Sequence, residues 1–150
     1  ISEVLSLLSK VEATGASEIS SSLLQIGAML RHRSLLMVFS DLLAEPPAIR
    51  DALLRLRHRN HDIILFHVLD EAEVRFPFQG MVELTDPESS ENMVVDADAA
   101  RRDYVAGVDD FREHYRHICQ QVGIDYVPLD TSMPFDAALM EYLINRQQRA

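Results

Sequence analysis

The sequence predicts an α/β fold with three layers, α/β/α, around a mostly parallel, doubly wound sheet. Residues 35–39 and 63–69 are continuously apolar, as strands covered on both faces are. Between them, an amphipathic segment begins at Pro46-Pro47 and ends at the basic run 57–60. A strand, a helix and a strand joined by short loops form a βαβ unit, whose strands are parallel and whose crossover is right-handed.

The N-terminal part predicts two helices. Residues 1–12 carry apolar side chains at helical spacing, and the turn-forming residues 14–17 interrupt them. Ser17 is a candidate N-cap for a second helix, which ends at the basic trio 31–33. The apolar stripe of this second helix comprises Ile19, Leu23, Ile26 and Leu30.

The middle of the chain interrupts the alternation of strands and helices. Turn residues punctuate 74–95, and two short β-like pieces, 81–85 and 92–95, predict a hairpin inserted beside the main sheet. A long amphipathic helix follows from Asp96 to about Val122 and stops at Gly123. Its predicted inward residues are Tyr104, Val108, Phe111, Tyr115, Ile118 and Val122.

The C-terminal part completes the predicted sheet. Residues 125–129 form a third parallel-type strand, and Pro134 begins a last helix. The apolar face of that helix comprises Ala138, Leu139, Tyr142 and Leu143. With 150 residues the chain has the size of a single domain, here taken as 1–150 with the hairpin insertion around 74–95.

Composition excludes several classes of protein. The formal charge of -10 repels phosphate backbones and anionic lipids, so no nucleic-acid partner is expected. No apolar run approaches the roughly 18 residues of a membrane span, so membrane insertion is not expected. The one cysteine, Cys119, allows no intrachain disulfide and favours a reducing cytoplasm.

Acidic residues follow each of the three predicted parallel strands, at Asp41, Asp70 and Asp130. Ligands of open parallel sheets gather at the carboxyl ends of the strands, but Asp in that position also caps the next helix. For Asp70 and Asp130 we favour the capping role. For Asp41, which ends the stretch SLLMVFSDLL together with Ser40, both interpretations stay open.

Other chemistry-bearing residues give weaker signals. The pairs His58/His61 and His114/His117 have a spacing that zinc sites use, but each lacks a third ligand, so a solvated helix face is favoured. His67 lies in an apolar strand, which favours a core histidine with one hydrogen-bonded nitrogen. No Gly-x-Ser-x-Gly or glycine-rich phosphate loop occurs, and Cys119 falls near an apolar helix face.

Five short motifs occur in a characteristic order: a Gly-x-Ser-Glu loop before a helix, a strand ending Ser-Asp-Leu, a strand ending Leu-Asp, a Phe-Pro-Phe-x-Gly turn and a Gly-x-Asp-Tyr strand entrance. They lie at 15–18, 40–42, 69–70, 76–80 and 123–126. Together they resemble the bacterial family called domain of unknown function 58, over roughly residues 12–145. Members of that family look like von Willebrand factor A domains and usually occur beside MoxR-type AAA+ ATPases.

This resemblance implies a metal site at the carboxyl edge of the sheet. In von Willebrand factor A domains an Asp-x-Ser-x-Ser loop, a Thr and an Asp hold a divalent cation, and here Ser17 takes the Thr position and Asp41 the Asp position. The Asp-x-Ser-x-Ser loop has no counterpart, so the site is incomplete. We therefore expect Mg²⁺ in a full-length parent and no cofactor in this chain.

The same missing loop implies that the chain is a partial domain, lacking the first strands of the sheet. An apolar strand edge would then be exposed, and we expect a homodimer or missing chain to pair with it. The function expected is a non-enzymatic protein-interaction module, as an adaptor for a MoxR-type ATPase in complex assembly. The alternative is a doubly wound, metal-dependent hydrolase that uses Asp41 and Asp70.

Overall fold

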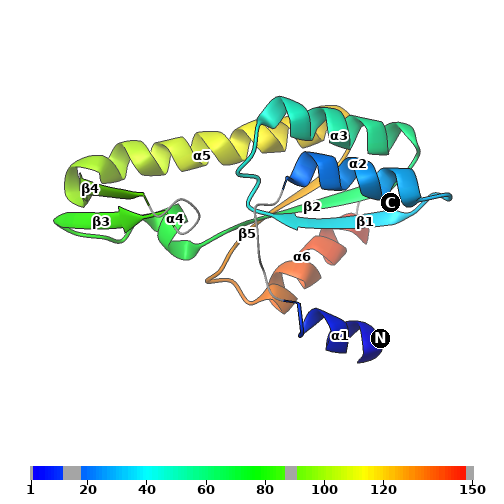
Figure 1. Cartoon of the computed structure of the whole chain (residues 1–150), viewed down its shortest axis with the longest axis horizontal. Helices are drawn as coiled ribbons and strands as arrows, with labels where there is room; N and C mark the ends of the chain where they lie inside the picture. Colours follow the sequence, from blue (N-terminus) through cyan, green and yellow to red (C-terminus); the bar gives the residue numbers. More distant parts are fainter. Residues whose placement is uncertain (1, 12–17, 87–90, 148–150) are drawn as a thin grey trace.

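The computed structural model describes residues 2–11, 18–86 and 91–147. Six helices and five strands occur in them (Figure 1). In chain order they are α1 (Ser2–Leu8), α2 (Ile19–Met29), β1 (Leu35–Ser40), α3 (Pro46–His58), β2 (Asp62–Leu69), α4 (Glu71–Arg75), β3 (Met81–Thr85), β4 (Asn92–Asp96), α5 (Ala97–Val122), β5 (Asp125–Asp130) and α6 (Phe135–Gln147).

The main sheet has three parallel strands in the order β1-β2-β5. β1 and β2 pair in register from Leu35 with Asp62, and β2 and β5 from Ile64 with Asp125. The mixed α/β class and the parallel βαβ unit of β1, α3 and β2 are therefore confirmed. Among the described residues, no helix combines the length and the apolar character needed to cross a membrane.

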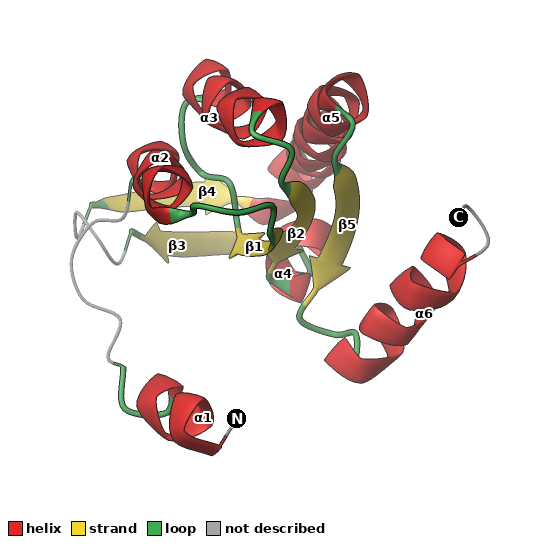
Figure 2. Cartoon of the chain, turned by 90° about the vertical axis from the view of Figure 1, so that its right-hand side faces the viewer, coloured by secondary structure: helices red, strands yellow, loops and turns green. Residues whose placement is uncertain are grey.

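Helices lie on both faces of this sheet (Figure 2). The larger core lies between the sheet and α2, α3 and α5, where Leu23, Leu53, Leu65, Tyr115 and Cys119 are buried together. The smaller core lies on the other face, where Ala138 of α6 packs against Ile64, Phe66 and Leu129. Side chains of β2 alternate between the two cores, so β2 is the central strand.

The predicted hairpin is a separate antiparallel sheet of β3 and β4, which projects beyond the main sheet beside the start of α5 (Figure 1). The bounds of the short helix α4 before this hairpin were not predicted, although Asp70 was expected to cap a helix. Phe76, the C-cap residue of α4, has a left-handed conformation (φ 45°), and its ring packs on Tyr104 of α5 with ring centroids 4.5 Å apart.

Several expectations about these elements were wrong. Ile26 of α2 and Leu143 of α6, predicted on apolar faces, are exposed. β1 is fully covered on one face only: α6 packs mainly on β2 and β5, and although its first residue, Phe135, approaches Phe39, alternate β1 side chains stay exposed. Tyr104 is not a core residue but packs on Phe76 outside the main core. The N-cap position of α2 is Glu18, and Ser17, predicted there, lies outside the described residues.

Candidate functional site

The loop after β1 contains Asp41, the one acidic residue whose role the sequence left open. The hydroxyl of Ser40 accepts a hydrogen bond from the Leu42 backbone N–H at 3.0 Å. A carboxylate oxygen of Asp41 accepts another from the Leu43 N–H at 3.2 Å. Asp41 therefore shapes a turn and caps no helix, since the N-cap of α3 is Glu45.

Leu42 gives this loop its unusual backbone. Its φ of 60° is left-handed, which costs a leucine roughly 1–2 kcal/mol. The conformation is retained because the Leu42 side chain is completely buried and because Tyr115 Oη donates to its carbonyl at 3.2 Å. The main core therefore holds the loop in place.

His67 of β2 anchors the same loop from beneath. Its Nε2 lies 3.0 Å from the backbone oxygen of Asp41, and its Nδ1 lies 2.7 Å from Tyr126 Oη. Because a carbonyl oxygen only accepts, Nε2 carries the proton and Nδ1 accepts from Tyr126. Burial lowers the pKa of His67 to about 4, so the ring is neutral at pH 7. The core-histidine prediction is confirmed, with both nitrogens hydrogen-bonded instead of one.

The carboxylate of Asp41 is exposed above this buried network. A hard cation such as Mg²⁺ prefers about six oxygen ligands. Within the part of the chain that the structure describes, no three His, Cys, Asp or Glu residues group closely enough to hold a metal ion. The described residues at Asp41 therefore do not by themselves fit the cation that the resemblance implies, and Ser17 lies outside them.

Asp70 and Asp130 have structural partners. Asp70 is the N-cap of α4 in a full capping box: it accepts from the Ala72 N–H at 2.8 Å, and Glu73 accepts from the Asp70 N–H. Its other oxygen accepts from Thr131 Oγ1 at 3.0 Å. The capping role of Asp70 is confirmed.

Asp130 was also predicted to cap the next helix, and this was wrong, because Asp130 caps a turn. It accepts from the Ser132 N–H at 3.0 Å and from the Ser132 hydroxyl, and α6 begins five residues later at Phe135. Hydrogen bonds from Ser132 lower the pKa of the Asp130 carboxyl.

One of the four paired histidines, His61, is not where the sequence predicted it. His61 does not lie on a solvated face: its side chain is 2% exposed and its Nδ1 accepts from the Ser34 N–H at 3.2 Å. Its Nε2 is buried with no hydrogen-bond partner among the described residues. His58, His114 and His117 are exposed, as predicted. Cys119 is buried, and burial raises the pKa of its thiol to about 12, which excludes an activated thiolate.

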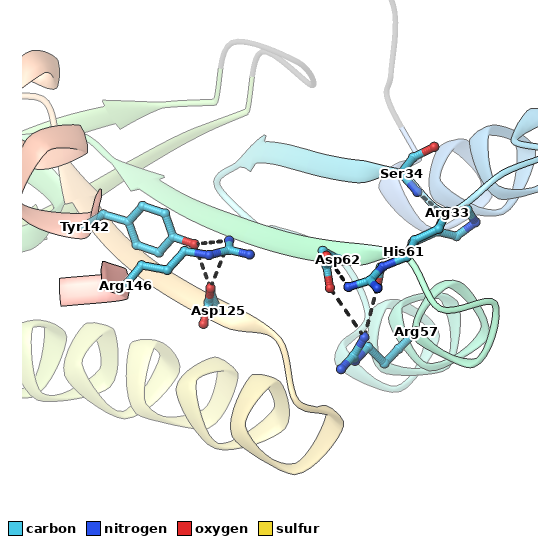
Figure 3. A network of polar contacts seen from close by, with 8 residues as sticks. All are labelled: Arg33, Ser34, Arg57, His61, Asp62, Asp125, Tyr142 and Arg146. Carbon is cyan, nitrogen blue, oxygen red and sulfur yellow. Dashed lines mark hydrogen bonds and ion pairs between the residues drawn. The ribbon is translucent and has the colours of Figure 1, made fainter. Parts of the chain in front are cut away.

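A polar network was not predicted. It lies at the N-terminal ends of β2 and β5, at the end of the sheet opposite to Asp41 (Figure 3). Arg33 binds Asp62 at 2.9 Å, which lowers the pKa of the Asp62 carboxyl. On β5, Asp125 accepts from Tyr142 Oη at 2.6 Å and pairs with Arg146 at 3.4 Å. The basic residues before β1 were visible in the sequence. The sequence did not show that Arg33 would pair with Asp62, because the two lie about 30 residues apart along the chain.

The exposed side of β1 is the most extensive apolar feature of the main sheet. Leu35, Met37 and Phe39 are 55%, 45% and 50% exposed, and we call these three side chains the β1 face. The Phe39 ring stacks on Phe66 at 4.5 Å and approaches Phe135 of α6 at 5.9 Å. Isolated exposed leucines are ordinary, but a contiguous apolar strip along a strand indicates an interaction surface.

Comparison with known proteins identifies one family. A family model described as "Protein of unknown function DUF58" matches residues 2–114, which is most of the chain. Four of the five motifs fall within the match, and the fifth, at 123–126, lies beyond it. Comparisons with curated proteins and with solved structures found no match. The chain belongs to the DUF58 family.

Proposed function

We propose that this chain is a non-enzymatic protein-interaction module with a von Willebrand factor A-like, three-layer arrangement. The observation that carries the proposal is β1, an edge strand of the described sheet that exposes an apolar face. The resemblance adds a MoxR-type AAA+ ATPase as the partner, and the lone buried cysteine favours a reducing cytoplasm.

The backbone of β1 supports this use. The Asp62 N–H donates to the Ser34 carbonyl, so even-numbered residues of β1 direct their backbone groups toward β2. Odd-numbered residues then direct their N–H and C=O groups outward, and they are the same residues that form the β1 face. Backbone hydrogen bonding and apolar contact are therefore available together, which is what the addition of a strand requires.

Within the described residues, the sequence of β1 itself also lacks two of the features by which proteins prevent such pairing. Edge strands are commonly protected by charged residues, proline or a bulge. β1 reads LLMVFS and contains neither charge nor proline. In solution this chain is proposed to form a homodimer in which two β1 strands pair antiparallel across a two-fold axis, because a two-fold contact uses the same surface on both copies.

Sedimentation velocity of the wild type, Met37→Lys and Met29→Lys tests this proposal. Met29 is 79% exposed at the end of α2, so its variant carries the same substitution away from β1. The wild type and Met29→Lys should sediment as dimers and Met37→Lys as a monomer. A wild type that stays monomeric at high concentration, or a Met37→Lys dimer, would refute pairing through β1.

Mg²⁺ binding at Asp41 and Ser17 is proposed only for a longer parent in which further ligands are present. Calorimetric titration of Mg²⁺ into this chain and into Asp41→Ala tests that restriction. We expect no difference between the two titrations. Tight binding that Asp41→Ala abolishes would restore the hydrolase that uses Asp41 and Asp70, an alternative which the capping role of Asp70 does not favour.

A further inference from the structure

A groove of about 940 Å³ runs along β5, at the opposite edge of the sheet from β1. Figure 2 shows β5 at this edge with α5 above it and α6 below it. Arg112 and Arg116 of α5 line one wall of the groove, and Tyr142 and Arg146 of α6 line the other. We call this feature the β5 groove.

The residues that line the β5 groove carry a net positive charge, whereas the whole chain is acidic. The chain has 24 acidic and 14 basic residues, yet three arginines and only one acid, Asp125, line the groove. Arg116 also pairs with Glu113 at 3.3 Å, outside the lining, so the three arginines exceed these two acids by one positive charge. Asp125 is already engaged by Tyr142 and Arg146. The groove is therefore a local site of positive potential on an acidic protein.

The three arginines lie on two different elements that line the groove. Arg112 and Arg116 lie one helical turn apart on α5, on the same face. The guanidinium of Arg116 lies 5.9 Å from the Tyr126 ring centroid. Across the groove, Tyr142 Oη lies 2.7 Å from Arg146 Nη1 and helps to fix its position. Guanidinium groups from both elements, with aromatic rings beside them, fit a segment that bears several carboxylates, because guanidinium and carboxylate groups form charge-assisted hydrogen bonds.

The free edge of β5 favours recognition through side chains. Thr131 N–H donates to Leu69 O, so odd-numbered residues of β5 face β2 and even-numbered ones face outward. Pro128 is even-numbered and has no N–H to donate. A partner strand could not form a continuous ladder there, so the arginines must supply the specificity.

The charge of the neighbouring segment limits what can bind. Residues 71–110, which include α4, the β3–β4 hairpin and the first half of α5, contain eleven acidic and three basic residues, a net charge of -8. A nucleic acid long enough to extend from the groove along α5 would meet this negative charge, whereas a short acidic segment can stay within the groove. No glycine-rich loop offers backbone N–H groups to a phosphate.

We propose that the β5 groove binds a short acidic segment of a partner protein, whose carboxylates pair with Arg112, Arg116 and Arg146. This interface lies on a different edge from β1, and it does not depend on pairing of that strand.

The test uses an N-acetylated hexaglutamate peptide, with hexaglutamine as the uncharged control. Binding to the ¹⁵N-labelled chain is followed by NMR at about 0.1 M salt, where the Debye length is about 10 Å and the distant acidic residues are screened. Two further titrations use ATP and a single-stranded oligothymidylate. They separate carboxylate recognition from binding of a phosphate or of nucleic acid.

The variant pair is Arg112→Gln/Arg116→Gln, and its matched control is Arg50→Gln/Arg55→Gln on α3, where both arginines are exposed outside the groove. Hexaglutamate should shift the amide signals of Tyr126 and Val127. Each groove arginine removed should weaken binding about two- to fivefold, while the α3 variant should bind as the wild type.

Three results would overturn the proposal. One is equal binding of hexaglutamate and hexaglutamine. The second is equal loss of affinity in the groove variant and the α3 variant, which would indicate net charge alone. The third is tighter binding of ATP or oligothymidylate at the same amides, which would assign the groove to phosphate. A thermal unfolding curve of each variant shows that the fold is retained, and the single variant Arg116→Gln replaces the double one if it is not.

Discussion

Lowering the pH should destabilise this fold through His67. Burial holds the pKa of His67 at about 4 in the folded chain, against 6.5 for an ordinary histidine. Between these two values the unfolded chain binds a proton that the folded chain does not, so stability is complete above pH 6.5 and falls as the pH decreases toward 4. At pH 5, which is 1.5 units below the pKa of His67 in the unfolded chain, the free energy of unfolding has fallen by about 2 kcal/mol, because each unit costs about 1.36 kcal/mol.

Urea unfolding at pH 7.5 and pH 5 measures this loss, with His67→Gln as the reference. The variant lacks the titrating group, so its free energy of unfolding should fall by about 2 kcal/mol less than that of the wild type over this range. An aspartate contributes less than about 0.1 kcal/mol at pH 5, because its unfolded pKa lies near 3.8, and the carboxyl contributions are the same in both proteins. Equal losses in both proteins would refute the argument, as would an NMR titration in which the His67 ring protonates near pH 6.5.

Three further predictions concern the core. Tyr115→Phe removes the hydrogen bond to the Leu42 carbonyl, and it should lower the free energy of unfolding by about 1 kcal/mol in urea unfolding. Cys119, with its thiol pKa raised to about 12, should resist iodoacetamide at pH 8 and react only in denaturant, as mass spectrometry would show. Gly27→Ala places a Cβ 2.6 Å from the buried Leu56 Cδ2, and it should lower the thermal midpoint although alanine favours helix.

The parallel core of the fold could be predicted because its signals are local. The apolar runs of β1 and β2, and the amphipathic helix with two prolines between them, each point to one structure over a few residues. The roles of Asp70 and His67 followed in the same way, from a position after a strand and from a place within an apolar run. These interpretations needed no knowledge of which elements meet in space.

What could not be predicted depends on contacts between distant segments. An apolar run does not show whether one face or both faces of a strand are covered, and the exposure of β1 follows from where α6 lies. His61 stands among basic residues and appeared solvated, yet it is buried under the chain entering β1. The left-handed conformation of Leu42 has no sequence signal, since a leucine there is stable only because Tyr115 and the core hold it.

The two edges of the sheet show how the same architecture can offer two different kinds of contact. At β1, outward backbone groups and an apolar face occur together, so the strand can accept another strand. At β5, Pro128 removes the outward donor at the middle of the strand, and arginines from α5 and α6 line the space beside it. A β-strand partner is therefore favoured at one edge and an acidic side-chain partner at the other. Because β2 lies between the two edges, the two proposed contacts use different strands, and a substitution at one edge can be tested without changing the other.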